Sequence, residues 1–140
     1  MRPTISDFPL RAIDKLRYAD TDRQGHVNNA VFATFLETGR VEVIFGQELT
    51  DADASFVIAR LELDFLSEVN WPGEVEIGTS VQDIGRSSFR LFQLVFQNGE
   101  PVAKAVTVIV QMNETTRKSH PLTEETRQKL EKLTSSALNT

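Results

Sequence analysis

The chain of 140 residues contains no cysteine. This absence excludes thiol nucleophiles, disulfide bonds and thiolate metal sites, and it fits a reducing compartment. Histidine is scarce as well, with two residues, so a zinc hydrolase site is not expected. No apolar run is long enough to cross a membrane, and the first residues, MRPTISDFPL, lack the apolar core of a signal peptide. We therefore expect a soluble, cytoplasmic protein with no metal, no other cofactor and no membrane partner.

A basic surplus is also missing. The chain has 15 Lys and Arg against 20 Asp and Glu, a formal net charge of −5. Nucleic acid is therefore not expected as a partner, because phosphate binding usually requires a surplus of cations. The nucleophile-elbow, dinucleotide-binding and Walker motifs are absent too. The length and the ordinary apolar content predict one globular domain that spans residues 1–140.

The stretch DTDRQGHVNN, Asp20 to Asn29, is the most informative part of the sequence. It combines two carboxylates, an imidazole, a glycine and two carboxamides directly before an apolar pattern with helical spacing. Such residues favour caps and turns, so the stretch predicts a loop that leads into a helix N-terminus. Unpaired backbone N–H groups at a helix N-terminus suit an anion or a developing oxyanion. A carboxylate just upstream of such a pocket is a workable start for acyl chemistry.

Apolar periodicity predicts the remaining elements. A helix is expected from Asn29 to about Phe45, with Thr38 and Gly39 lowering its propensity midway. Alternating apolar residues predict strands, separated by turn signals at WPG, Gly85 and NGE, over residues 10–18, 57–65, 75–82, 89–96 and 102–112. A short helix is expected over residues 122–133. These elements predict an α+β fold in which an antiparallel sheet, its last four strands forming a meander, packs over a central helix. Its uncovered edges predict an oligomer, either a homodimer or a homotetramer.

The segment RYADTDRQGHVNNAVFATFLETGRVEVIF resembles the opening of hotdog-fold acyl-CoA thioesterases of the 4-hydroxybenzoyl-CoA thioesterase type. The shared pattern is an aromatic residue, then D-x-D-x-x-G-H-V-N-N, then a helix with aromatic residues and an acidic one. The segments LELDFLSEV, WPGEVEIGTSV, IGRSSFRLFQLVF and AKAVTVIVQM resemble the sheet of that family. The resemblance runs from about Arg11 to Leu130. It implies a hotdog fold, with the sheet wrapped around a long central helix, and hydrolysis of an acyl-CoA thioester.

Carried over by position, the resemblance places the catalytic carboxylate at Asp22. This residue would act as a general base toward water or as a nucleophile that forms an anhydride. The alternative is that Asp22 only caps a turn. Asp20 is expected to be a structural acceptor that holds the loop. His26 would either donate a hydrogen bond to the thioester carbonyl or order the loop.

The start of the helix supplies the other candidates near the reaction. Backbone N–H groups from Val27 to Asn29 are expected to stabilise the oxyanion, because a helix start leaves them unpaired. Gly25 is expected to adopt a positive φ or to allow close approach of the substrate. Asn28 and Asn29 are interpreted as helix caps, with a contact to a substrate amide as the alternative.

Residues outside the loop complete the predicted site. Arg86, Ser87 and Ser88 are candidates for contacts with the pantetheine or the phosphates of coenzyme A, with an ordinary turn as the alternative. Glu37 is a candidate second acid.

Two other functions stay open. Plant acyl-ACP thioesterases carry a similar D-x-x-x-H-V-N-N motif, with an asparagine where this chain has Gln24; the net negative charge favours coenzyme A over an acidic carrier protein. A hotdog module that binds acyl-CoA without hydrolysing it is the alternative from another class.

Overall fold

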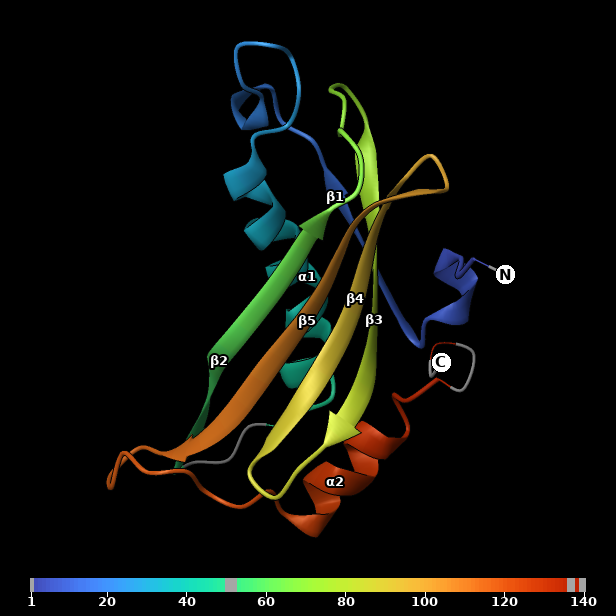
Figure 1. Ribbon diagram of the computed structural model, residues 1–140. Helices are drawn as coiled ribbons and strands as arrows, with labels where there is room; N and C mark the ends of the chain where they lie inside the picture. The colour runs from blue at the N-terminus through green and yellow to red at the C-terminus, as the bar shows by residue number, and fades with distance from the viewer. Residues whose placement is uncertain (1, 50–52, 136–137, 139–140) are drawn as a thin grey trace.

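The computed structural model describes residues 2–49, 53–135 and 138 of the chain. Within these ranges an antiparallel sheet of five strands carries α1 (Phe32–Ile44) against one face and α2 (Glu124–Glu131) at one end (Figure 1). The strands are β1 (Leu10–Lys15), β2 (Ala54–Phe65), β3 (Glu74–Ile84), β4 (Ser88–Gln97) and β5 (Glu100–Asn113). The short 3-10 helices are η1 (Ile5–Asp7), η2 (Tyr18–Asp20) and η3 (Asn29–Val31). The α+β class predicted from the sequence is confirmed.

The strands lie in the order β1-β3-β4-β5-β2, and all neighbours are antiparallel. β3, β4 and β5 form consecutive hairpins, and the β4–β5 turn has the positive φ values of a tight hairpin, 53° at Asn98 and 80° at Gly99. The predicted four-strand meander is wrong at its first strand, because β2 pairs with β5 instead of β3. The connection over residues 66–73 crosses the end of the sheet, a distance of roughly 14 Å for three strand spacings. We call residues 66–73 the crossover.

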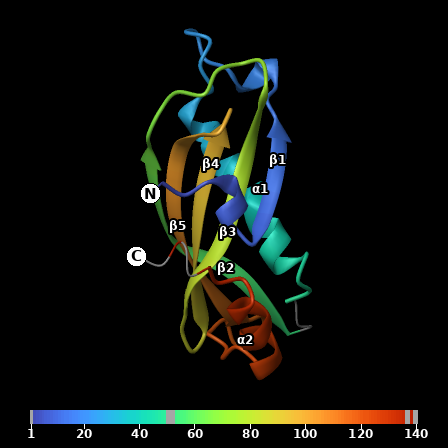
Figure 2. The same ribbon diagram turned by 90° about the vertical axis from the view of Figure 1, so that its right-hand side faces the viewer.

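The helix follows the prediction closely, since η3 and α1 together run from Asn29 to Ile44. Phe32, Phe35, Leu36 and Val43 are buried at helical spacing and form the face that packs on the sheet. Their neighbours in the core are inward-facing residues of the three central strands, including Val75, Ile77, Val95, Ala103 and Ala105. Leu130 of α2, with the flanking Leu122 and Leu133, belongs to a second core cluster that includes Val43 of α1. In the turned view of Figure 2, α2 lies at the end opposite to the loops that precede α1.

Gly39 is the position where α1 comes closest to the sheet. A Cβ atom on Gly39 would lie 2.6 Å from both Gln93 Nε2 and Thr79 Oγ1, and 2.8 Å from Ile77 Cγ2. The buried Gln93 amide donates hydrogen bonds to the Leu36 carbonyl and to Thr79 Oγ1, each at 3.0 Å. The residue that weakens the helix locally therefore allows the helix to rest on β3 and β4.

We expect Gly39→Ala to lower the free energy of unfolding by about 1–3 kcal/mol, because the added methyl overpacks this contact. On an exposed helix the same change would be stabilising by roughly 0.5–1 kcal/mol. Urea denaturation measures the difference, and Ala33→Gly on the exposed side of α1 is the control for intrinsic helix propensity. A Gly39→Ala variant more stable than the native protein would contradict the close approach.

The described residues include no helix that is long and apolar enough to cross a membrane.

Candidate active site

The polar loop of residues 20–29 lies beside the crossover. The Val27 N–H donates a hydrogen bond of 2.9 Å to the Val69 carbonyl, and His26 forms a β-bridge with Asn70. Because β2 pairs at the far edge of the sheet, its connection to β3 must pass this loop. The crossover therefore forms one wall of the site, and it does so because of a strand order that was not predicted from the sequence.

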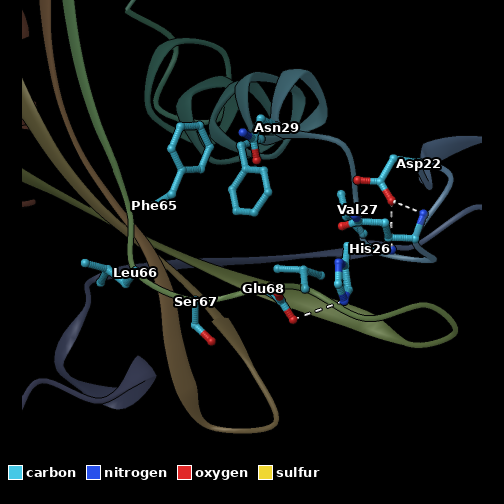
Figure 3. Close-up of a pocket in the computed structure, with 11 residues that line it drawn as sticks. Asp22, His26, Val27, Asn29, Phe65, Leu66, Ser67 and Glu68 are labelled. Carbon is cyan, nitrogen blue, oxygen red and sulfur yellow. Dashed lines mark hydrogen bonds and ion pairs between the residues drawn. The ribbon is translucent and has the colours of Figure 1, made fainter.

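A cavity of about 370 Å³ lies between this loop, the start of α1 and the crossover (Figure 3). Its apolar side includes the rings of Phe32 and Phe65, which meet edge to face with centroids 5.1 Å apart. The lining residues are Asp22, Gln24, His26, Val27, Asn29, Phe32, Phe65, Leu66, Ser67, Glu68 and Val69. Four predicted site residues of the loop, Asp22, His26, Val27 and Asn29, thus share one cavity with residues of the crossover.

The two oxygens of the Asp22 carboxylate have different surroundings. Oδ1 accepts hydrogen bonds from the backbone N–H groups of Gln24 at 2.8 Å and His26 at 3.2 Å. This is the turn-capping arrangement that the sequence offered as an alternative. The other oxygen accepts no hydrogen bond from the described residues, and in Figure 3 it points away from the turn, toward the side of Asn29. One oxygen therefore fixes the loop while the other is available to a substrate or a water molecule.

Asp20 is the structural acceptor that the sequence predicted. Its buried carboxylate accepts hydrogen bonds from the Arg17 backbone N–H at 2.8 Å and from Arg17 Nη2 at 2.9 Å. Its carbonyl accepts from the Asn28 N–H at 2.8 Å. The two acidic residues of the motif are thus divided between holding the loop and facing the cavity.

Glu68 is a residue of the site that the sequence analysis missed. Its Oε2 lies 3.0 Å from His26 Nε2, so the imidazole is tied to the crossover. Glu68 is far from His26 in the sequence and belongs to an unremarkable polar run after β2, so the strand order alone brings the two together. Both interpretations of His26, as a residue that orders the loop and as a donor to the thioester carbonyl, stay predictions.

The backbone N–H groups at the start of the helix are not equally available. Those of Val27 and Asn28 already donate to the carbonyls of Val69 and Asp20, so the structure leaves neither free for an oxyanion. The Asn29 N–H, the first of η3, donates to no acceptor among the described residues. The Asn28 side chain accepts a hydrogen bond from the Ala30 N–H at 3.0 Å, which confirms it as a helix cap.

Gly25 has the positive φ expected of it, at 80°, but it does not line the cavity. Arg86 and Ser87 lie in the β3–β4 turn and Ser88 begins β4, at the end of the sheet opposite to the crossover. Their backbone carbonyls accept hydrogen bonds from neighbouring segments, those of Ser87 and Ser88 from Gln111 and Gly85. Within one chain the structure does not bring this turn near Asp22, and its contact with coenzyme A stays a prediction.

Glu37 is exposed on α1 and is not among the residues that line the cavity. It lies near Arg40. Partial burial lowers the pKa of the Arg40 guanidinium, and the negative charge of Glu37 partly offsets this by raising that pKa. The described structure therefore places Glu37 beside a cation of its own helix.

An antiparallel sheet wrapped around one helix, with a polar loop and a cavity at the start of that helix, is the architecture of the hotdog fold. The model of the Thioesterase-like superfamily matches residues 16–130, and the chain belongs to this family. A thioesterase of Thermus thermophilus, solved in complex with coenzyme A and Zn, is 35% identical with a TM-score of 0.79, and the match covers 91% of this chain and 95% of that one.

Two further matches have lower sequence identity. A protein of Pseudomonas aeruginosa strain PAO1 shares the fold with a TM-score of 0.86, at 23% identity over 97% of this chain and 99% of the other. The acyl-CoA thioesterase YbgC of Helicobacter pylori is 27% identical over 84 residues. That match covers 59% of this chain and 63% of the relative, so the chain spans less than two thirds of its length.

The zinc of the Thermus thermophilus structure has no counterpart that these residues would form. The described part of the chain contains no group of three or more His, Asp or Glu side chains that could hold a metal ion.

Proposed function

We propose that this protein hydrolyses an acyl-CoA thioester to a free carboxylic acid and coenzyme A in the cavity beside Asp22. The observation that carries the proposal is the carboxylate of Asp22, with one oxygen fixed by two backbone N–H groups and the other open to the cavity. A general base or nucleophile needs this combination of fixed position and free lone pairs. The named relatives act on acyl-CoA or bind coenzyme A, which supports the same substrate class.

The reaction would follow one of two routes. Asp22 removes a proton from a water molecule that attacks the thioester carbonyl carbon, or its carboxylate attacks that carbon itself and the resulting anhydride is cleaved by water. In both routes the C–S bond breaks, and coenzyme A leaves as the thiolate and takes up a proton. The Asn29 N–H and the positive end of the helix stabilise the oxyanion. His26, held by Glu68, orders the loop or donates to the carbonyl.

Release of free thiol from acyl-CoA tests the proposal on the native protein. Because the chain has no cysteine, a thiol-reactive dye reports only liberated coenzyme A. The same acyl group is offered on coenzyme A and on acyl carrier protein. Hydrolysis of the acyl carrier protein substrate is measured by the free carboxylic acid that it releases. Faster release from coenzyme A is expected, and faster release from the carrier protein would favour the acyl-ACP alternative. Binding of acyl-CoA without release would favour a non-catalytic module.

We also propose that the protein works as a homodimer joined along the free edge of β2. Ile58, Leu61 and Phe65 on this strand are 46%, 41% and 49% exposed, although they pair with buried positions of β5. These side chains lie on the same face of the sheet as α1, but α1 packs mainly over β1, β3 and β4 and leaves them partly exposed. An edge strand with exposed apolar side chains is a surface that a second copy would cover.

Leu61→Glu is expected to convert the assembly to single chains of 15.7 kDa, because the dimer edge would take a charged carboxylate out of water. Light scattering after size-exclusion chromatography measures the mass. Ile13→Glu, at a 58% exposed position on the opposite edge strand, is the control and should keep the native mass. A native mass of one chain, or an unchanged mass for Leu61→Glu, would argue against this edge.

A further inference from the structure

The charged side chains that line the cavity are Asp22, Glu68 and His26. Lysine and arginine do not occur among the lining residues of the described chain. The imidazole of His26, which alone could oppose a negative charge there, is already engaged by Glu68 at 3.0 Å. The cavity thus presents two carboxylates and no uncommitted cation.

Part of the remaining lining is apolar. Phe32 and Phe65 form the edge-to-face pair, and the buried Val69 belongs to the same core cluster as Phe32. An apolar surface of this kind offers no hydrogen bonds to an ionised group that leaves water, and the desolvation of such a group is costly. The cavity therefore suits an uncharged acyl group for two reasons: its carboxylates repel a negative charge, and its apolar rings do not solvate one.

We infer that Glu68 is a specificity-determining residue that restricts the substrates to acyl groups without a carboxylate of their own. This inference rests on the proposed function, because it concerns the acyl group that Asp22 would attack. Glu68 lies on the crossover and contacts His26, whose backbone N–H donates to Asp22 Oδ1 (Figure 3). A dicarboxylic acyl group would therefore place its second carboxylate between Asp22 and Glu68.

The size of the cavity makes this repulsion measurable. A compact cavity of 370 Å³ is about 9 Å across, so a carboxylate inside it stays within about 9 Å of Glu68. Two like charges at this separation change an equilibrium roughly fivefold when the effective dielectric constant lies between those of protein and water. Glu68 is 67% exposed, so the effect is largest at low ionic strength, where the Debye length is about 30 Å at 0.01 M salt.

A matched pair of substrates isolates the charge. Pentanoyl-CoA and glutaryl-CoA have the same number of acyl carbons, and glutaryl-CoA carries a carboxylate where pentanoyl-CoA carries a methyl group. We expect the native protein to hydrolyse pentanoyl-CoA with a kcat/KM at least roughly tenfold higher than that for glutaryl-CoA, since two carboxylates oppose the second substrate. In Glu68→Gln the ratio of the two kcat/KM values should fall roughly fivefold. The ratio cancels any common effect of a displaced His26.

The control variant is Glu114→Gln. Glu114 follows Asn113, which pairs with Ala54 at the start of β2, whereas the cavity lies at the other end of that strand. Its loss removes the same charge from the protein and should leave the ratio unchanged. Added salt should lower the native ratio toward that of Glu68→Gln, because a purely steric preference would not respond to ionic strength.

Each failure has a distinct meaning. Equal hydrolysis of both substrates by the native protein, or an unchanged ratio in Glu68→Gln, would overturn this inference and leave the proposed thioesterase function intact. Binding of pentanoyl-CoA with hydrolysis of neither substrate would overturn the proposed function and the inference with it.

Discussion

Asp22→Asn is expected to reduce kcat for acyl-CoA hydrolysis by roughly a hundredfold or more and to leave the fold intact. Asparagine has nearly the same shape as aspartate, and its Oδ1 can still accept the hydrogen bonds from the Gln24 and His26 N–H groups. The loop should therefore keep its conformation. The variant lacks the negative charge that would accept a proton from water or attack the thioester.

Asp20→Asn is the control variant for this prediction. The buried Asp20 carboxylate accepts one hydrogen bond from the Arg17 backbone N–H and one from the Arg17 guanidinium. The Asp20→Asn variant should therefore lose about 1–3 kcal/mol of unfolding free energy. Its folded form should still hydrolyse acyl-CoA. Thiol release and thermal unfolding, measured on both variants, separate the two roles. Lost stability in Asp22→Asn with full activity, or lost activity in Asp20→Asn without lost stability, would contradict the assignment.

Phe35→Ala is expected to lower the free energy of unfolding by about 3–5 kcal/mol. Phe35 is 2% exposed in the core between α1 and the sheet, and its ring packs edge to face against Phe32 with centroids 5.5 Å apart. Truncation to alanine removes the apolar ring from this contact and leaves a cavity that the rigid sheet cannot fill. The cost should therefore exceed that of the overpacked Gly39→Ala variant.

Urea denaturation at a fixed protein concentration measures this loss. Thr34→Ala is the matched control, because Thr34 is the preceding residue of the same helix and is exposed; it should change the free energy by no more than about 0.5 kcal/mol. Equal stabilities for the two variants would contradict the packing of α1 on the sheet.

The sequence predicted the elements of the fold better than their arrangement. The polar stretch before the helix and the alternation in the strands are local signals, and both describe the structure correctly. The order of the strands is not local, since alternation shows which side chains share a face but not which strand lies beside which. The pairing of β2 with β5 therefore appeared only in the structure.

The same limit applies to the site. The structural role of Asp20 could be predicted from the motif, because Asp20 lies within the loop that it shapes, whereas the catalytic role of Asp22 stays a prediction. Glu68 and the carbonyl of Val69 belong to the crossover, so neither the partner of His26 nor the use of the Val27 N–H could be predicted. Gly39 illustrates a third case, in which the sequence shows a weak helical residue and only the packing gives its reason.

Product formation by the native protein from an uncharged acyl-CoA distinguishes hydrolysis from binding alone. Free thiol and free carboxylic acid are quantified together under conditions of large substrate excess. We expect equal amounts of the two products, in many-fold molar excess over the protein. Acyl-CoA that binds while neither product exceeds one equivalent of protein would contradict the proposed hydrolysis.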